Sequence, residues 1–343
     1  MVALVAAVAV VASSCVMNGT WAAMPAPVVP APGVGTRMHD VSCTSANWCM
    51  AVGGYGQLPL VETWNGTAWS VRPAPPVSPP SATFVSAELR TVDCGTTSAC
   101  VARIDRVSAG AEVVPHLVLW DGAQWHEVPP GGPVDGPFDD PAPRSCAPDG
   151  TCLIVNQTAG RIITWDGDSF TNVPFGTSPI GAVEVAGVEC FAADDCLALT
   201  KERLLRWNGS SFAAVPGSAV DTVALPGSSF SCTSSTRCVA YGTDSLFVGL
   251  HWNGTAWSSV RMPVPGYPFF GDLSCGATEC VGIAQDLSLV RRMVTWNGAG
   301  WYAGPALPAG VERLSCVGLR CVAVGAGGAP EVPIATRYTW TNP

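Results

Sequence analysis

Cysteine is the residue type whose spacing most clearly suggests chemistry in this chain of 343 residues. Fourteen of the 15 cysteines form seven pairs, five with the spacing C-x5-C and two one residue shorter. A zinc site would need closer spacing and two further ligands for every pair, and a redox-active motif is not expected in seven copies. We therefore expect seven disulfides formed in an oxidising compartment, each worth roughly 2 kcal/mol by loop closure. The expected bonds are Cys43–Cys49, Cys94–Cys100, Cys146–Cys152, Cys190–Cys196, Cys232–Cys238, Cys275–Cys280 and Cys316–Cys321.

A second candidate is a mixed-charge group in a chain with only 13% charged residues. We assign this group to long loops at residues 73–88, 104–113 and 129–144, because variable loops on a rigid scaffold usually hold ligands. The candidate binding residues are Arg103, Asp105, Arg106, Asp135, Asp139, Asp140 and Arg144. The three aspartates after position 130 could ligate calcium, but carboxylates in a Pro/Gly-rich loop are more often simply exposed. We therefore predict no metal site, no cofactor and no catalytic residue.

A repeated turn motif follows each of the first six cysteine pairs. Its pattern is W-[ND]-G-x-x-[WF], and it begins at Trp64, Trp120, Trp165, Trp207, Trp252 and Trp296. Asn-Gly between two β-branched runs is the strongest short signal for a hairpin, because a type I′ turn requires positive φ at both central residues. We predict four short strands in each unit. In the first unit, the first strand ends at residues 41–43, and the other three lie at 49–53, 60–64 and 69–72.

Seven units of four antiparallel strands predict an all-β fold, a seven-bladed β-propeller. The seventh unit contains only three strands before the sequence ends, whereas residues 17–21 resemble an isolated fourth strand. We expect this N-terminal strand to complete the last blade and so close the ring. Residues 15–343 then form a single propeller domain, and we expect it to be a monomer.

The first 14 residues are interpreted as a signal peptide, because residues 2–12 form an apolar run too short to span a membrane. The sequence Ala12-Ser13-Ser14-Cys15 resembles the lipobox of bacterial lipoproteins. That resemblance implies lipidation of Cys15 and anchoring to the outer face of the cell membrane. The alternative is an ordinary secretory signal cut near Ser13, which leaves Cys15 as a free thiol.

The six turns also resemble the Asp-box of sialidase-type (BNR) propellers, a structural and non-catalytic motif between strands three and four of a blade. The seven-unit architecture is similar to the central propeller of galactose oxidase, whose copper is held by His and Tyr. The four histidines here are scattered, and each cysteine after Cys15 has a partner in its repeat. In its S-C-x5-C-x-A-V-G repeats, the chain resembles exported bacterial propellers.

These features favour a secreted or lipid-anchored cell-surface propeller that binds or scaffolds a protein or glycan, rather than an enzyme. A net charge of −9 argues against nucleic acid as the partner. Contact with the membrane is expected only through the lipid. The alternative is a glycoside hydrolase of sialidase type with its site at the channel mouth. Such an enzyme should place paired carboxylates and clustered arginines at the central entrance, which a binding protein need not do.

Overall fold

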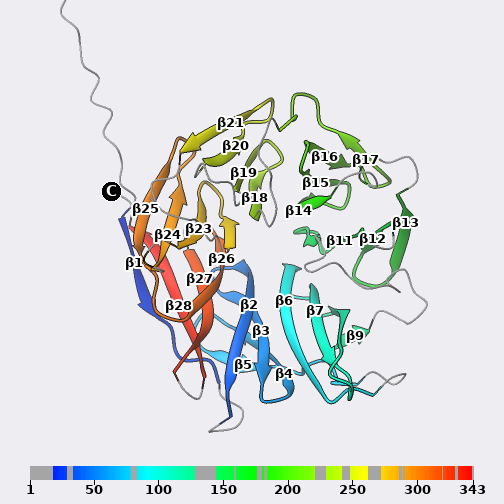
Figure 1. The fold of residues 1–343 in the computed structure, drawn as a ribbon, viewed down its shortest axis with the longest axis vertical. Helices are drawn as coiled ribbons and strands as arrows, with labels where there is room; N and C mark the ends of the chain where they lie inside the picture. The colour runs from blue at the N-terminus through cyan, green and yellow to red at the C-terminus, as the bar shows by residue number, and fades with distance from the viewer. Residues whose placement is uncertain are drawn as a thin grey trace, which may run out of the picture.

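The computed structural model is a ring of seven four-stranded antiparallel sheets arranged around a central axis (Figure 1). It describes residues 18–28, 34–78, 83–127, 144–157, 160–175, 180, 184–220, 229–241, 248–261, 272–285, 288, 290–318, 320–328 and 331–341. Within these ranges there is no helix, and consequently none that is long and apolar enough to cross a membrane. The predicted all-β, seven-bladed propeller is confirmed.

Each blade places its first strand at the axis and its fourth at the rim. Blades 1 and 2 contain β2 (Thr36–Ser45), β3 (Trp48–Tyr55), β4 (Leu58–Trp64), β5 (Trp69–Val71), and β6 (Ser86–Thr96), β7 (Ala99–Val107), β8 (Val113–Trp120), β9 (Trp125–Glu127). Blades 3 and 4 contain β10 (Arg144–Cys146), β11 (Cys152–Asn156), β12 (Arg161–Trp165), β13 (Phe170–Pro174), and β14 (Val185–Ala192), β15 (Asp195–Thr200), β16 (Leu204–Trp207), β17 (Phe212–Ala214). Blades 5 and 6 contain β18 (Ser229–Ser234), β19 (Arg237–Tyr241), β20 (Val248–Trp252), β21 (Trp257–Arg261), and β22 (Asp272–Cys275), β23 (Cys280–Gln285), β24 (Arg291–Trp296), β25 (Trp301–Ala306).

Blade 7 is completed by the N-terminus, as predicted. Its strands are β26 (Val311–Val317), β27 (Arg320–Gly327), β28 (Val332–Thr341) and, at the outer edge, β1 (Asn18–Ala23). Antiparallel pairing of β1 with β28 runs from Asn18 opposite Thr341 to Ala23 opposite Thr336. The two ends of the described chain therefore lie side by side in one sheet, as Figure 1 shows at its left edge.

One predicted loop is wrong. The sequence predicts a long connection over residues 104–113, but β7 continues to Val107 and β8 begins at Val113, so the connection is limited to residues 108–112. Arg103, Asp105 and Arg106 lie inside β7, opposite Thr91, Glu88 and Ala87 of β6. Charged side chains are tolerated in this strand because each is paired with an opposite charge.

The repeated turn forms as predicted, but its expected type I′ conformation is wrong. Only the glycine has a positive φ, for example 95° at Gly66. The loop spans four residues, because Trp64 pairs directly with Trp69. The Asn65 Oδ1 atom accepts hydrogen bonds from the N–H groups of Thr67 at 3.0 Å and Ala68 at 2.9 Å. This side-chain cap replaces the backbone geometry of a two-residue turn and works equally well with Asp.

All seven predicted disulfides are present, with Cα–Cα distances between 3.9 and 4.0 Å. Each bond joins the end of a blade's first strand to the start of its second. The disulfides and the turn motifs therefore share one face of the disk, which we call the stapled face. The connections from strand two to three and from strand four to the next blade lie on the opposite face, which we call the variable face.

Apolar clusters join neighbouring blades. One of them packs Trp64, Trp69 and Met38 of blade 1 against Val322 and Val324 of blade 7. The two tryptophans also contact each other, with ring centroids 5.6 Å apart. Five further blades contain such a pair of aromatic rings across strands three and four, including Trp21 and Tyr338 in blade 7. The paired aromatic residues are therefore part of the hydrophobic core.

A closed belt of seven hydrogen bonds links the blades around the axis. In each blade, the N–H of the first cysteine donates to the side chain that precedes the corresponding cysteine of the neighbouring blade. The seven bonds, from donor to acceptor, are Cys94 to Ser42 (3.0 Å), Cys146 to Asp93 (2.6 Å), Cys190 to Ser145 (3.0 Å), Cys232 to Glu189 (3.3 Å), Cys275 to Ser231 (3.1 Å), Cys316 to Ser274 (2.9 Å) and Cys43 to Ser315 (3.0 Å). The last bond joins blade 1 to blade 7, so the belt is complete.

We expect Ser42→Ala to lower the free energy of unfolding by about 1–3 kcal/mol, because it leaves the N–H of Cys94 buried without its acceptor. The matched control is Ser70→Ala, which removes an exposed hydroxyl from the outer strand of the same blade. Chemical denaturation under oxidising conditions measures both. Equal stability of the two variants would show that the belt contributes nothing.

Candidate functional site

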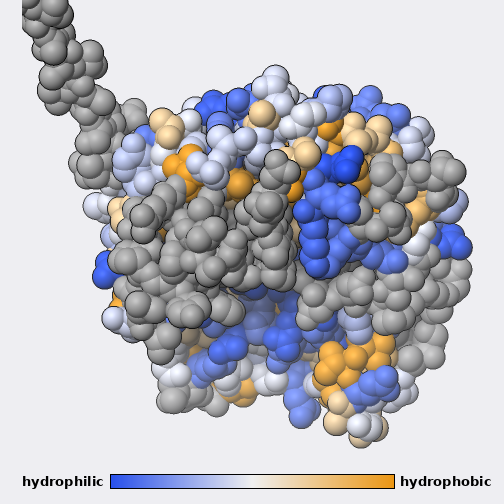
Figure 2. Space-filling model, turned by 45° about the horizontal axis from the view of Figure 1, so that its top comes forward, coloured by the Kyte–Doolittle hydropathy of each residue, from blue (hydrophilic) through white to orange (hydrophobic). Residues whose placement is uncertain are grey.

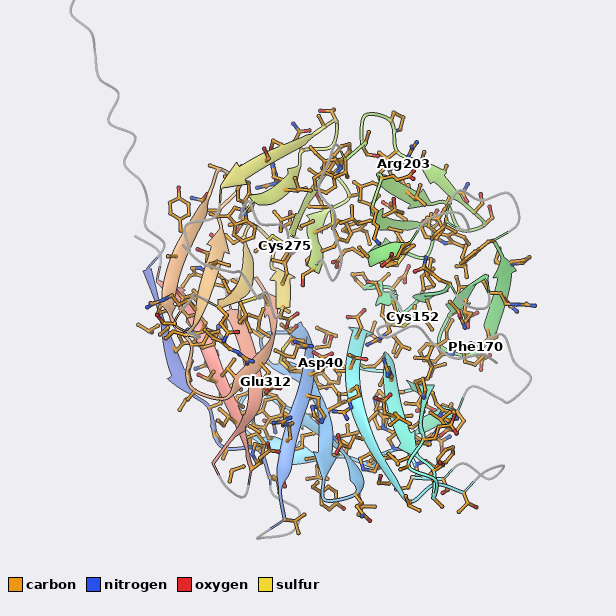
Figure 3. The ribbon with its side chains drawn as sticks, in the orientation of Figure 1. Asp40, Cys152, Phe170, Arg203, Cys275 and Glu312 are labelled. Atoms are coloured by element: carbon orange, nitrogen blue, oxygen red, sulfur yellow. A yellow bond between two sulfur atoms is a disulfide. The ribbon has the colours of Figure 1, made fainter. Side chains whose placement is uncertain are left out.

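The candidate site is a cavity of about 370 Å³ on the propeller axis. The inner strands of all seven blades line it, and most of its wall is made by the residues that precede the first cysteine of each pair. Figure 2 shows hydrophilic residues gathered in the hollow at the centre of the molecule. Asp40 lies at the inner edge of its blade, whereas Phe170 lies at the outer rim (Figure 3).

Two of the cavity's carboxyl groups belong to the hydrogen-bonded belt. Asp93 of blade 2 and Glu189 of blade 4 occupy the position that is serine in the other five blades. Each accepts the N–H of the next blade's cysteine, so both side chains are held by the scaffold. Serine makes the same bond without a buried charge, and these two acids are therefore not required by the belt.

Two further carboxyl groups form a second level, three residues before the cysteine. Asp40 accepts the N–H of Val92 at 2.8 Å, and Asp272 accepts the N–H of Leu314 at 2.7 Å. Both bonds again cross from one blade to the next. In addition, the Oδ1 atom of each aspartate accepts the N–H of the residue that follows it, at 2.9 Å and 3.0 Å respectively.

Arginines alternate with these acids around the ring. Arg144 comes from blade 3, between the blades of Asp93 and Glu189, and Arg313 comes from blade 7, between the blades of Asp272 and Asp40. Blade 5 contributes uncharged residues, Ser229, Phe230 and Ser231. The cavity is thus surrounded by two acid–arginine–acid arcs and one neutral sector.

The carboxyl groups titrate well above their ordinary range. Burial, and then the neighbouring charge of Asp272, raises the pKa of Asp40 to about 7. Burial, and then the charge of Asp93, raises the pKa of Glu189 to about 8. Burial also raises the pKa values of Asp93 and Asp272, against the opposing effects of backbone N–H donors and of Arg144 and Arg313. At neutral pH, the cavity therefore carries less negative charge than its four carboxyls suggest.

The structure describes four of the seven sequence-predicted binding residues, and these four lie in three separate environments. Arg144 lines the axial cavity, but Asp135, Asp139, Asp140 and the candidate lipidation site Cys15 lie outside the described residues. Arg106 is fully buried and forms an ion pair with Glu127, with one contact at 3.1 Å. Its second nitrogen donates to the carbonyl of Pro76 at 3.2 Å. The environment of Arg106 is that of a structural residue.

Arg103 and Asp105 belong to an ionic group that joins blades 1 and 2. Arg103 contacts Asp105 at 2.7 Å, and Arg90 bridges Asp105 at 3.4 Å and Glu88 at 3.2 Å. His39 of blade 1 completes the group through a 3.0 Å contact with Glu88. The hydrogen bond from His39 lowers the pKa of Glu88. The described contacts of this group connect β2 of blade 1 with β6 and β7 of blade 2, so the group links two neighbouring blades.

Glu62 is a buried carboxyl outside the cavity, and it holds the segment that follows the closing strand. Its Oε2 atom accepts the N–H of Val28 at 3.0 Å, and burial raises its pKa to about 7. The corresponding position is aliphatic in blades 2 to 6, for example Val118 and Ile163. Glu62 therefore ties the N-terminal segment to blade 1.

The described parts of the chain contain neither a candidate metal site nor a cluster of histidines. Those parts contain no group of three or more His, Cys, Asp or Glu residues arranged to hold a metal ion. The histidines lie in separate places. His116 packs against Phe84 with ring centroids 5.5 Å apart, and His251 packs against Trp296 at 4.8 Å.

The two faces of the disk differ in their exposed apolar residues. Seven large apolar side chains in the described chain are 39% to 54% exposed. All of them lie in or next to the connections on the variable face, in blades 6, 7, 1 and 2; they are Val28, Leu58, Val71, Val85, Val113, Val290 and Val332. We call this set the apolar rim. Among described residues, the stapled face exposes none.

The pKa of Glu189 predicts a pH-dependent stability. Because its pKa is raised in the folded state, the protein is most stable below the unfolded value and loses stability as the pH rises through about 8. We expect Glu189→Ser to be more stable than the wild type at pH 8 and no more stable at pH 4. Glu112→Ser removes the same charge at an exposed site and is the control. Denaturant titrations at both pH values test this, and a pH-independent difference would contradict it.

No protein-family model matches the sequence, and no curated protein is similar to it in sequence. Solved structures are similar in fold. A catalytically inactive histidine variant of virginiamycin B lyase from Staphylococcus aureus, with quinupristin, has a TM-score of 0.59 and 9% identity, covering 94% of this chain and 99% of that one. YCF48 bound to D1 peptide has a TM-score of 0.54 and 12% identity, covering 94% of this chain and 95% of that one. These similarities establish a propeller fold of this size.

Proposed function

We propose that this protein is a binding or scaffold propeller that docks a protein partner on its variable face. The observation that carries the proposal is that, within the described part of the chain, the exposed large apolar residues all lie on that face. Single exposed valines are common on protein surfaces, but a set gathered on one face is typical of an interaction surface. The similar fold of YCF48, solved with a bound peptide, supports a peptide or protein as the partner.

The opposite face is less suited to recognition. Its loops are short and repeated, and their conformations are fixed by the disulfides and by the Asn or Asp caps. Connections on the variable face differ from blade to blade in length and sequence. Diversity on a rigid frame is what a specific binding surface requires.

The cavity favours binding over turnover. Its four carboxyl groups accept backbone N–H groups from neighbouring blades, so each is held in a fixed position. Two arginines line it within the described chain, fewer than the three that a sialidase uses. A fixed, hydrogen-bonded carboxylate is a preorganised acceptor for a ligand.

A glycoside hydrolase is the second candidate, favoured by one specific observation. The cavity combines carboxyls of raised pKa with arginines, which are the groups expected at the centre of such an enzyme. Release of the fluorophore from a panel of fluorogenic glycosides, lost on Glu189→Ser, would establish this function in place of simple binding.

We place the protein outside the cytoplasm, anchored by a lipid on Cys15. Seven disulfides indicate an oxidising environment. Asn18, the first residue of β1, pairs with the end of β28 and therefore starts at the stapled face. A lipid three residues before it would turn the stapled face toward the membrane and the variable face toward the partner.

We expect charged substitutions in the apolar rim to abolish partner binding. The pair Leu58→Glu and Val113→Glu places two charges where an apolar contact is required, whereas Ala68→Glu adds one charge of the same sign to an exposed turn on the stapled face. Cross-linking on intact cells, followed by mass spectrometry, should recover a partner with the wild type and Ala68→Glu only. Equal recovery with all three proteins would reject the rim as the docking surface.

We expect Cys15→Ser to move the protein from the membrane fraction to the medium. In cells grown with a labelled fatty acid, the wild type should carry the label and Cys15→Ser should not. Antibodies against the variable face should bind intact cells that display the wild type. An unlabelled wild type, or a variable face that antibodies cannot reach, would refute the anchor or its orientation respectively.

A further inference from the structure

Two residues that line the axial cavity differ from the residue at the same position in the other blades, and the belt does not require the difference. Five blades use serine for the belt position, and serine is both an acceptor and a donor. Blades 2 and 4 instead use Asp93 and Glu189, at a cost visible in their raised pKa values. Residues that break a repeated structural rule are candidates for function. Both departures flank Arg144, which is also directed at the cavity.

We propose that the axial cavity binds a small neutral polyhydroxylated molecule, a mono- or disaccharide by chemical class, between Asp93, Arg144 and Glu189. The inference goes beyond docking on the variable face, because it concerns a different ligand at a different place. Neither site requires the other to be occupied.

The arrangement of charges selects for a neutral ligand. Each arginine lies between two acidic blades, so an anion that approaches Arg144 or Arg313 also meets carboxyl groups from the adjoining blades. A cation that approaches Asp93 or Glu189 meets Arg144 between them. A neutral molecule suffers neither repulsion, and it can interact with both kinds of group at once.

The hydrogen-bonding groups select for hydroxyls. A sugar hydroxyl donates one hydrogen bond and accepts others, so neighbouring hydroxyls suit a wall where carboxylate acceptors stand beside a guanidinium donor. A carboxylate has about four lone-pair positions, so a bond to a backbone N–H leaves acceptor capacity for a ligand. Serine hydroxyls from blades 1, 5, 6 and 7 add to the polar wall. Phe230 in the neutral sector offers an apolar surface to the C–H face of a sugar ring.

The size of the cavity sets the size of the ligand. A volume of about 370 Å³ is near the lower end of the range for small-molecule sites, about 300–1,000 Å³. A mono- or disaccharide fits this range, whereas a longer chain would have to leave the cavity along the axis.

The test uses the full chain on a glycan array that carries neutral, acidic and amino sugars. The key variant, Asp93→Ser with Glu189→Ser, restores the repeat's own residue at both positions and keeps the acceptor of each belt bond. Glu112→Ser is the control, because it removes an exposed carboxylate that does not line the cavity. Thermal unfolding confirms that each variant is folded.

We expect the wild type and Glu112→Ser to bind neutral glycans and the double variant to bind at least tenfold more weakly. If the double variant fails to fold, Ser229→Leu tests the same point, since it narrows the cavity without altering a charge and should weaken binding equally. The proposal is overturned by absence of binding to neutral sugars, by preference for acidic or amino sugars, or by undiminished binding in the double variant.

The rim variant Leu58→Glu with Val113→Glu separates the two proposals. It should bind sugars like the wild type even though it has lost the protein partner. Sugar binding that fails while partner docking persists disproves the cavity site alone, and the converse result disproves the docking surface alone.

Discussion

The belt of hydrogen bonds around the axis is the contact on which the ring depends. Each blade is a complete antiparallel sheet, so its backbone ladder ends at its own edges and cannot join the next blade. Apolar packing between blades is strong but has no fixed direction. The belt fixes the orientation of each blade relative to the next, because one N–H from every blade must reach one side chain of its neighbour. Its seven bonds lie between 2.6 and 3.3 Å, and the ring can close only if all the blades are rotated in the same way.

The disulfides act on the same residues as the belt. The donor of each bond is the N–H of the first cysteine, and the disulfide ties that residue to the second strand of its blade. The covalent bond therefore fixes the position of the donor, and the preceding side chain fixes the acceptor. This coupling explains why the cysteines repeat in every blade rather than in one or two. It also places the belt acceptors on the cavity wall, so a change of acceptor changes the cavity without altering the blade.

The repeated motifs made the fold predictable from the sequence, but they did not lead to the residues that line the axial cavity. Cysteine spacing and the Trp-Asn-Gly turn were sufficient to predict blade number and disulfides, because each depends on residues close in sequence. Closure pairs the two ends of the chain, and it was predictable because the seventh unit contains three strands and residues 17–21 resemble the fourth. The type I′ turn was wrong, since the side chain of Asn65 caps the loop. Arg106 was wrongly assigned to a loop because its partner, Glu127, is 21 residues away and no local pattern reveals the pair. The acids at positions 93 and 189 would have been found by comparing the residue before the first cysteine across the seven units.

The two faces differ in how far their loops are fixed by contacts that stabilise the fold. On the stapled face, every loop is occupied by a disulfide or an Asn or Asp cap, so a change there would disturb the belt or the Trp64–Trp69 pair behind it. The described part of the variable face carries no disulfide, and its connections differ from blade to blade. Some of them still link blades: the carbonyl of Gln57 accepts the N–H of Ala87 at 3.1 Å, and that of Glu331 accepts the N–H of Thr36 at 2.9 Å. The docking surface that we propose lies on that face, whereas the ligand site that we propose is bounded by the inner strands of all seven blades. A propeller built in this way separates the two kinds of recognition by geometry, and substitutions in one site should leave the other intact.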